Sequence, residues 1–188
     1  MLSRKKIILK YSVIIFFLLL INIYFKNLKN VYADYLKLPM NEFDVKIGEG
    51  YLKFFGIKIY KAKLFSSKNF NKNKLFENKF ALDIKYFKNF TSSEIAKISI
   101  KEINKLKLGN KVERDSWFHW MKNNFPNISK NDSLIGVFSP KDGFTLYYNN
   151  VYFASNSDIE FSKSFFDIWL DKKTSESGLR KKLLKINQ

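Results

Sequence analysis

The sequence predicts an α+β domain in which helices pack on an antiparallel sheet. Three observations lead to this prediction. Apolar and polar residues alternate in several short stretches, which is typical of half-buried strands. Other segments carry apolar residues at the spacing of one helix face. Turn-forming residues separate these segments, and Asn149-Asn150 between two apolar stretches fits a two-residue hairpin turn.

The longest β-favouring stretch outside the apolar N-terminal segment is Gly48–Phe65. It predicts either one extended strand or two strands joined at Gly56. Leu52 and Phe54 share one parity along this stretch, whereas Ile57 takes the other. Such a change at a glycine is typical of a bulge or bend. We expect the sheet to be built outward from this stretch.

The remaining elements are predicted in chain order. Strands are expected over Phe43–Ile47, Phe80–Tyr86, Ser133–Ser139, Phe144–Tyr148 and Val151–Ala154, with a solvated loop over Ser66–Lys79. Helices are expected from Thr91, which forms a capping box with Glu94, to a stop near Gly109, then from Asp115 to Pro126, then over Asp158–Leu170, and around Leu179–Leu184.

The composition restricts the chemistry. The chain has 34 basic and 17 acidic residues, a net charge of +17, but only Arg4, Arg114 and Arg180 are arginine and the lysines are scattered. Because readers of phosphate and bases favour arginine, we expect no nucleic-acid partner, and an anionic surface is a minor alternative. The absence of cysteine and the single His119 exclude thiolate chemistry and a His-rich metal cluster, and we expect no metal or cofactor.

Residues 1–33 are predicted to be a signal peptide or an N-terminal membrane anchor. A basic head precedes residues 7–25, which are almost continuously apolar, and Val31-Tyr32-Ala33 is a candidate cleavage site. Residues 34–41 are expected to form a linker and 42–188 the domain. In either case the basic head stays inside and the chain from Asp34 onward is exported to the periplasm, either soluble or anchored in the inner membrane.

The ordered set of motifs resembles the chalcone isomerase-like family, specifically its exported bacterial branch. The motifs are Gly48-x-Gly50, Lys58-Ile59-Tyr60-Lys61-Ala62-x-Leu64-Phe65, Ala81-Leu82-x-Ile84-x-Tyr86, Asn131-Asp132, Gly143, and Phe161 to Asp171 with the Leu179-x-x-x-Leu183-Leu184 tail. The resemblance implies an open-faced β-sandwich, a large antiparallel sheet covered on one side by helices with a cleft between them. Members of the family close a flavanone ring or bind fatty acids, so the fold alone does not assign the function.

The resemblance also places cleft residues. An anion-handling Arg of the family falls on Leu52, a catalytic Thr near Phe55, a catalytic Tyr near Ser92, and a ligand-binding Tyr on Phe65. These replacements are apolar or small, so the activity is uncertain and a non-catalytic protein is favoured.

Two further cleft candidates come from the same stretch. Lys53 is either a relocated anion anchor or a solvated lysine, and Tyr60 is either a cleft hydroxyl or an ordinary strand tyrosine. Trp117, Trp120, Phe165 and Trp169 either line a pocket for an apolar ligand or belong to the core.

Three functions stay open. The leading hypothesis is an exported domain that binds an apolar or lipid-like molecule, such as a fatty acid, in its cleft. The alternatives are an intramolecular lyase or isomerase acting on a polyphenolic or enone substrate, and a structural or interaction protein of the envelope whose cleft is filled. The state of the cleft distinguishes the three: an open cleft with inward-facing hydroxyls favours chemistry, an open dry cleft favours ligand binding, and a filled cleft favours the interaction role.

Overall fold

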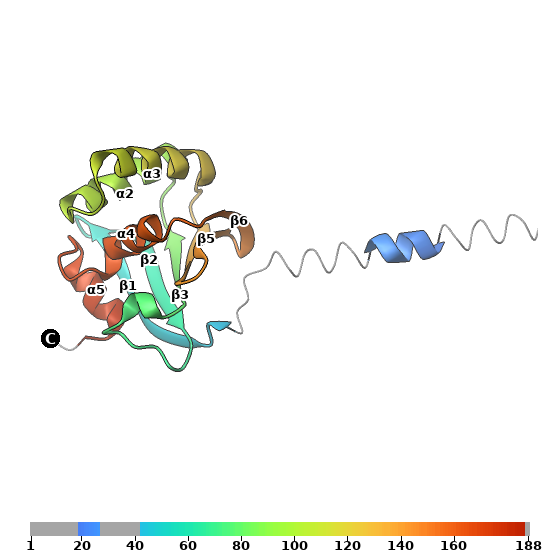
Figure 1. Ribbon diagram of the computed structural model, residues 1–188, viewed down its shortest axis with the longest axis horizontal. Helices are drawn as coiled ribbons and strands as arrows, with labels where there is room; N and C mark the ends of the chain where they lie inside the picture. The colour runs from blue at the N-terminus through green and yellow to red at the C-terminus, as the bar shows by residue number, and fades with distance from the viewer. Residues whose placement is uncertain (1–18, 27–41, 187–188) are drawn as a thin grey trace, which may run out of the picture. The chain divides into compact units, whose positions relative to one another are not determined.

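The computed structural model describes residues 19–26 and 42–186. The chain divides into two units, residues 1–37 and 38–188, and the second holds the sheet (Figure 1). Residues 19–26 are helical. None of the described helices has the length and apolar character needed to cross a bilayer. The predicted cleavage site, the linker and most of the apolar segment lie outside the described residues.

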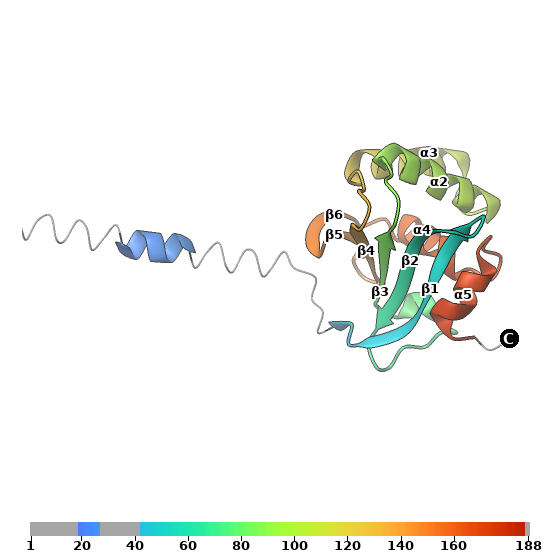
Figure 2. The same cartoon turned by 180° about the vertical axis from the view of Figure 1, so that it is seen from behind.

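Six strands form one antiparallel sheet in which each strand pairs with its neighbour in sequence (Figures 1 and 2). The strands are β1 (Val45–Phe54), β2 (Ile57–Ser66), β3 (Phe80–Tyr86), β4 (Ser133–Ser139), β5 (Gly143–Tyr148) and β6 (Val151–Asn156). The predicted antiparallel sheet is therefore confirmed, and the stretch from Gly48 to Phe65 is two strands. The separate strand predicted over Phe43–Ile47 is wrong, because Val45, Lys46 and Ile47 continue without a break into β1.

Two tight turns close the outer hairpins of the sheet. Phe55 and Gly56 join β1 to β2 with φ of 47° and 79°. Asn149 and Asn150 join β5 to β6 with φ of 50° and 69°. Positive φ at both central residues is the conformation whose twist matches the flanking strands, which confirms the predicted hairpin turn at the two asparagines. The register of β1 and β2 also shifts between Leu52 and Lys53, just before the turn at which the parity of the sequence changes.

The described domain contains four α-helices: α2 (Ser92–Lys105), α3 (Lys111–Asn124), α4 (Ile159–Leu170) and α5 (Ser177–Leu184). The capping box of Thr91 and Glu94 is confirmed at the start of α2. The predicted start of the next helix at Asp115 is wrong: α3 begins four residues earlier, at Lys111, after a capping box formed by Asn110 and Glu113. Asp158 caps α4 by accepting a hydrogen bond from the Phe161 amide.

The segment between β2 and β3 is less solvated than predicted. It contains the short 3-10 helix η2 (Leu75–Glu77), and Phe76 packs on the main core. The ring centroids of Phe76 and Phe138 are 5.1 Å apart. This packing explains why an Asn- and Lys-rich segment has a fixed conformation.

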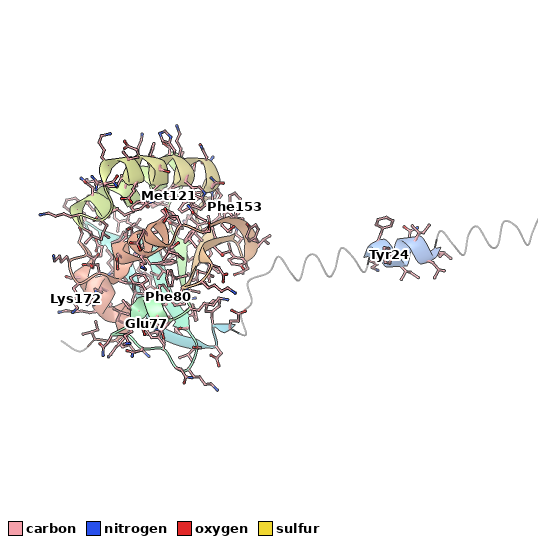
Figure 3. All side chains as sticks on the ribbon, in the orientation of Figure 1. Tyr24, Glu77, Phe80, Met121, Phe153 and Lys172 are labelled. Atoms are coloured by element: carbon pink, nitrogen blue, oxygen red, sulfur yellow. The ribbon has the colours of Figure 1, made fainter. Side chains whose placement is uncertain are left out.

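The main core lies between the sheet and the helices. Along β3, Phe80, Leu82, Ile84 and Tyr86 face this core, whereas Ala81 faces a small second cluster on the other side of the sheet. Figure 2 shows the strands in front of α4, and Figure 3 shows Phe80 inside the domain. One face of the sheet is thus covered by helices, as the predicted open-faced β-sandwich requires.

Candidate functional site

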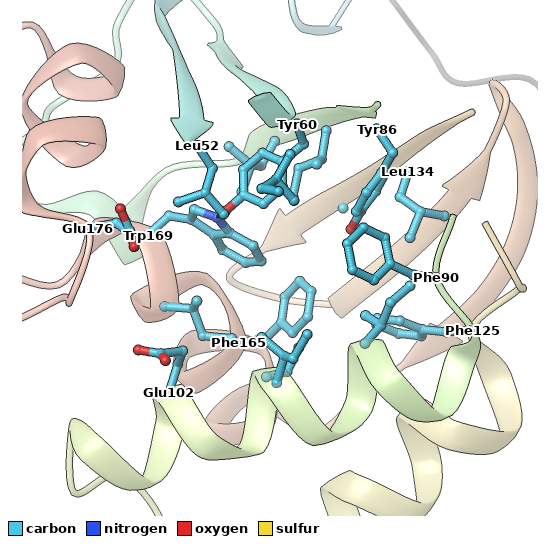
Figure 4. Close-up of a pocket in the computed structure, with 18 of the residues that line it drawn as sticks. Leu52, Tyr60, Tyr86, Phe90, Glu102, Phe125, Leu134, Phe165, Trp169 and Glu176 are labelled. Carbon is cyan, nitrogen blue, oxygen red and sulfur yellow. Dashed lines mark hydrogen bonds between the residues drawn. The ribbon is translucent and has the colours of Figure 1, made fainter. Parts of the chain in front are cut away.

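A cavity of about 370 Å³ lies between the sheet and helices α2 and α4 (Figure 4). This volume is at the lower end of the range for small-molecule sites. Most of its lining is apolar: Leu52, Ile59, Leu82, Ile84, Leu134 and Leu146 from the sheet, and Ile95, Ile98, Phe165, Phe166, Ile168 and Trp169 from the helices. The cleft is therefore open, and its walls suit an apolar molecule.

Tyr60 on β2 supplies the first polar group in this lining. Its hydroxyl accepts a hydrogen bond of 2.7 Å from Nε1 of Trp169 on α4. Burial raises the pKa of Tyr60 well above its usual value. The phenol therefore stays neutral, and its own proton remains available for donation to a bound molecule.

Tyr86 on β3 supplies a second polar group in the pocket lining. Its side chain is 7% exposed, and burial raises its pKa as well. The hydroxyl makes no hydrogen bond with any described residue, and Figure 4 shows it pointing into the pocket, towards Phe90. No buried side-chain oxygen or nitrogen of the described residues lacks a partner, so this hydroxyl reaches the open space of the pocket, where it can donate to a bound molecule or to solvent.

Two carboxylates lie at the opposite end of the pocket, on α2 and just before α5 (Figure 4). Glu102 accepts hydrogen bonds from Lys105 Nζ at 2.6 Å and from Ser175 Oγ at 2.7 Å. Burial opposes ionisation of Glu102, but these two bonds prevail and lower its pKa. Burial and the charge of Glu102 raise the pKa of Glu176.

The charge of the lining is consequently negative or neutral. None of the described residues that line the pocket is Lys or Arg. A carboxylate ligand would lack a counter-ion among these lining residues, because Lys105, which lies outside the lining, is already paired with Glu102.

The six predicted cleft residues fall in different places. Leu52 and Tyr60 line the pocket, and they lie opposite each other in the pairing of β1 with β2. Lys53 is exposed beyond the register shift, and Phe55 occupies the turn. Leu52 and Phe54 on either side of Lys53 both line the pocket, so alternation along β1 turns Lys53 to the other face, whereas Phe55 lies in the turn beyond the strand.

Phe65 and Ser92 also lie outside the lining. Phe65 pairs with Ala81 and, like it, faces the second cluster, because alternation along β2 turns it away from Tyr60. The amide of Ser92 in the first turn of α2 donates to Oδ1 of Asn127 at 3.0 Å. The resemblance placed polar residues of the family at these two positions, but neither position reaches this cavity. Trp117 and Trp120 also lie outside the lining and pack in the main core.

Sequence reasoning missed Tyr86, Glu102 and Glu176 as site residues. For Tyr86 a signal was present, since it shares the parity of Leu82 and Ile84 and a tyrosine hydroxyl on a buried face needs a partner. Glu102 and Glu176 carried no such signal, because the approach of α2 to the start of α5 is a tertiary contact.

Comparisons with known proteins agree with this architecture. A family model described as chalcone isomerase-like matches residues 37–185. A protein of Haemophilus influenzae is 32% identical over 108 residues, which are 57% of this chain and 52% of that protein, so the match spans about half of the relative.

The crystal structure of a fatty-acid binding protein from Arabidopsis thaliana superposes with a TM-score of 0.56 at 15% identity, over 74% of this chain and 85% of the other. At this identity the similarity demonstrates the fold alone. The family model covers most of the sequence, and it shows that the chain belongs to the chalcone isomerase-like family.

Proposed function

We propose that the domain binds an apolar, uncharged small molecule in the pocket between the sheet and helices α2 and α4, without catalysing a reaction on it. The observation that supports binding most directly is an open, mostly apolar cavity whose polar lining residues are two buried tyrosines, Ser99 and two glutamates. The inward-facing phenols are the feature that favours chemistry, whereas the apolar Leu52 at the position expected for the family's Arg favours binding without it. Burying a ligand there gains roughly 25 cal/mol per Å² of apolar surface removed from water. The fold neighbour from Arabidopsis is described as a fatty-acid binding protein, which supports a lipid-like ligand.

The polar groups restrict the ligand further. Tyr60 and Tyr86 both offer protons, so the preferred molecule carries an acceptor such as a carbonyl, ester or hydroxyl oxygen. A fatty-acid anion would have to give up its hydration without gaining a cation, which costs several kcal/mol. We therefore expect a fatty alcohol or ester to bind more tightly than the fatty acid of equal chain length.

Native mass spectrometry and calorimetric titration test this proposal with three probes of one chain length: the alcohol, the methyl ester and the acid. Binding of the alcohol and ester, with the acid weaker at neutral pH, is the expected result. A clean apo mass and no uptake of any probe would refute ligand binding. Tighter binding of the acid would refute only the preference for a neutral molecule.

Tyr86→Phe provides the matched variant. It should weaken the alcohol about 2- to 10-fold, the free energy of one hydrogen bond, and leave a plain alkane of similar size unaffected. An equal loss of affinity for the alcohol and the alkane would mean that the Tyr86 hydroxyl does not donate a hydrogen bond to the alcohol oxygen.

We further propose that the domain is exported and either released or held at the inner membrane by residues 7–25. The basic head and apolar run of the sequence support this. A C-terminal alkaline phosphatase fusion should be active, and the size of the mature chain distinguishes cleavage from anchoring. An inactive fusion that accumulates in the cytoplasm would contradict export.

A further inference from the structure

The end of the β1–β2 hairpin exposes three large apolar side chains in four consecutive residues. Phe54 is 65% exposed, Phe55 90% and Ile57 55%. Isolated apolar residues are normal on a protein surface, but a run at the end of a projecting hairpin is a contiguous apolar tip. Here "the tip" denotes residues Phe54 to Ile57.

The tip carries a backbone cost without a packing gain. Phe55 has a φ of 47°, in the left-handed region that asparagine and glycine tolerate and a bulky residue avoids. Its ring contacts Phe54, with the centroids 4.5 Å apart, and is otherwise in solvent. Asparagine would suit this turn better and expose no ring. The phenylalanine is therefore not explained by the stability of the isolated domain.

The charges around the tip are positive. Lys53 and Lys58 flank it and are exposed, and Lys58 Nζ lies 4.7 Å from the centroid of the Tyr51 ring. The nearest acid along the hairpin is Glu49, which is already paired with Lys46 and Lys61. Scattered lysines argued against an anionic surface at the level of sequence, but the fold places two of them beside exposed aromatic side chains.

The tip also adjoins the mouth of the pocket. Phe54 lines the pocket although it is 65% exposed, and so does Ile98 of α2, which is 53% exposed. The apolar surface therefore continues from the tip into the cavity. A surface that covered the tip would also cover this entrance.

We propose that the tip docks on an anionic lipid bilayer, with Phe54, Phe55 and Ile57 inserted at the level of the headgroups and Lys53 and Lys58 against acidic lipids. Aromatic rings flanked by lysines favour this interface, where apolar burial and attraction to anionic lipid act together. Docking does not depend on the pocket being a ligand site. If the pocket holds a ligand as proposed above, the entrance opens towards the membrane.

Vesicle sedimentation tests the docking with residues 38–188, because every buried core residue of the described domain lies inside this unit. The probes are vesicles of phosphatidylcholine with and without phosphatidylglycerol. We expect binding to the vesicles that contain phosphatidylglycerol, weakened by salt. The double variant Phe54→Ser/Phe55→Asn should bind these vesicles at least about tenfold more weakly. Val112→Ser on α3, where Val112 is 77% exposed, is the control and should bind as the unchanged domain does.

Phe55→Asn alone keeps the experiment interpretable, since it gives the turn its preferred Asn-Gly pair and should not unfold the hairpin. A melting temperature equal to that of the unchanged domain with reduced vesicle binding supports the proposal. Three results overturn it: no vesicle binding, equal binding by the double variant, or a concentration-dependent dimer that the double variant abolishes, which would make a second copy the occupant.

The full chain offers an independent readout. Because it has no cysteine, Ile57→Cys and Val112→Cys each give a single position for an environment-sensitive fluorophore. With vesicles that contain phosphatidylglycerol, the emission of the label at position 57 should shift to the blue and be quenched by brominated lipid. The emission of the label at position 112 should do neither. Equal responses at the two positions would refute insertion of the tip.

Discussion

Replacement of Tyr60 by phenylalanine isolates the hydrogen bond that joins β2 to α4. The change removes one oxygen, and with it the acceptor for Nε1 of Trp169 at 2.7 Å. Both side chains are buried, with 8% and 7% exposed, so the indole N–H loses its partner where water is scarce. An unsatisfied buried donor costs about 1–3 kcal/mol. For a domain of this size the melting temperature should fall by roughly 3–10 °C.

Tyr86→Phe is the matched control, because Tyr86 is equally buried and its hydroxyl makes no hydrogen bond with the described residues. It should leave the stability within about 0.5 kcal/mol, or raise it slightly. Urea unfolding of both variants, with fluorescence as the probe and the slope held in common, gives the two free energies. If the two substitutions cost the same, the hydrogen bond to Trp169 does not stabilise the domain and the argument fails.

Three other changes test separate parts of the fold. Burial raises the pKa of Asp167 from 3.8 to about 7, so the folded domain loses stability as pH rises between those values. Asp167→Asn should therefore stabilise the domain by about 1–2 kcal/mol near pH 8 and reduce the dependence of its stability on pH. An unchanged pH profile of urea unfolding would contradict this. A Cβ on Gly48 would meet backbone atoms of α5, whereas a Cβ on Gly178 would meet no atom. In calorimetry, Gly48→Ala should lower the melting temperature by at least about 5 °C, and Gly178→Ala should leave it nearly unchanged. Equal effects of the two substitutions would contradict the close packing of Gly48 on α5. Asp158→Ala removes the cap of α4 and the acceptor for Trp117 Nε1 at 2.9 Å, and should cost about 1–3 kcal/mol in urea unfolding; a loss below about 0.5 kcal/mol would refute this dual role.

The strands were predictable because the periodicity of two survives in a sheet with one covered face. Alternation over Phe80–Tyr86 identified β3 and its buried side, and Asn149-Asn150 identified the turn between β5 and β6. The start of α3 was not found, because Asn110 lies just after Gly109 in a stretch that reads as a loop and its capping partner Glu113 was overlooked. A cap depends on one hydrogen bond and leaves a weaker trace in sequence than a periodic face.

The candidate site was predictable only where it follows one strand. Tyr60 and Leu52 were found because they belong to the stretch that carries the family pattern. Phe65 was misplaced although alternation along β2 separates it from Tyr60 by an odd number of residues, which places the two on opposite faces. Glu102 and Glu176 depend on how α2 approaches α5, and no local pattern encodes such a contact.

The order of the strands has a consequence for how the domain opens. Five pairings join neighbours in the sheet. Three of them close over short turns and the β2–β3 pairing closes over the loop that contains η2, but β3 reaches β4 only after helices α2 and α3. This seam closes the longest loop, so we expect it to form late in folding and separate early in unfolding. The cavity is lined from both sides of the seam, by Leu82 and Tyr86 on one and Leu134 and Leu146 on the other. A bound molecule would therefore contact the strands on both sides of the seam and oppose their separation. Amide hydrogen exchange in β3 and β4 should then slow more on ligand binding than exchange in β6.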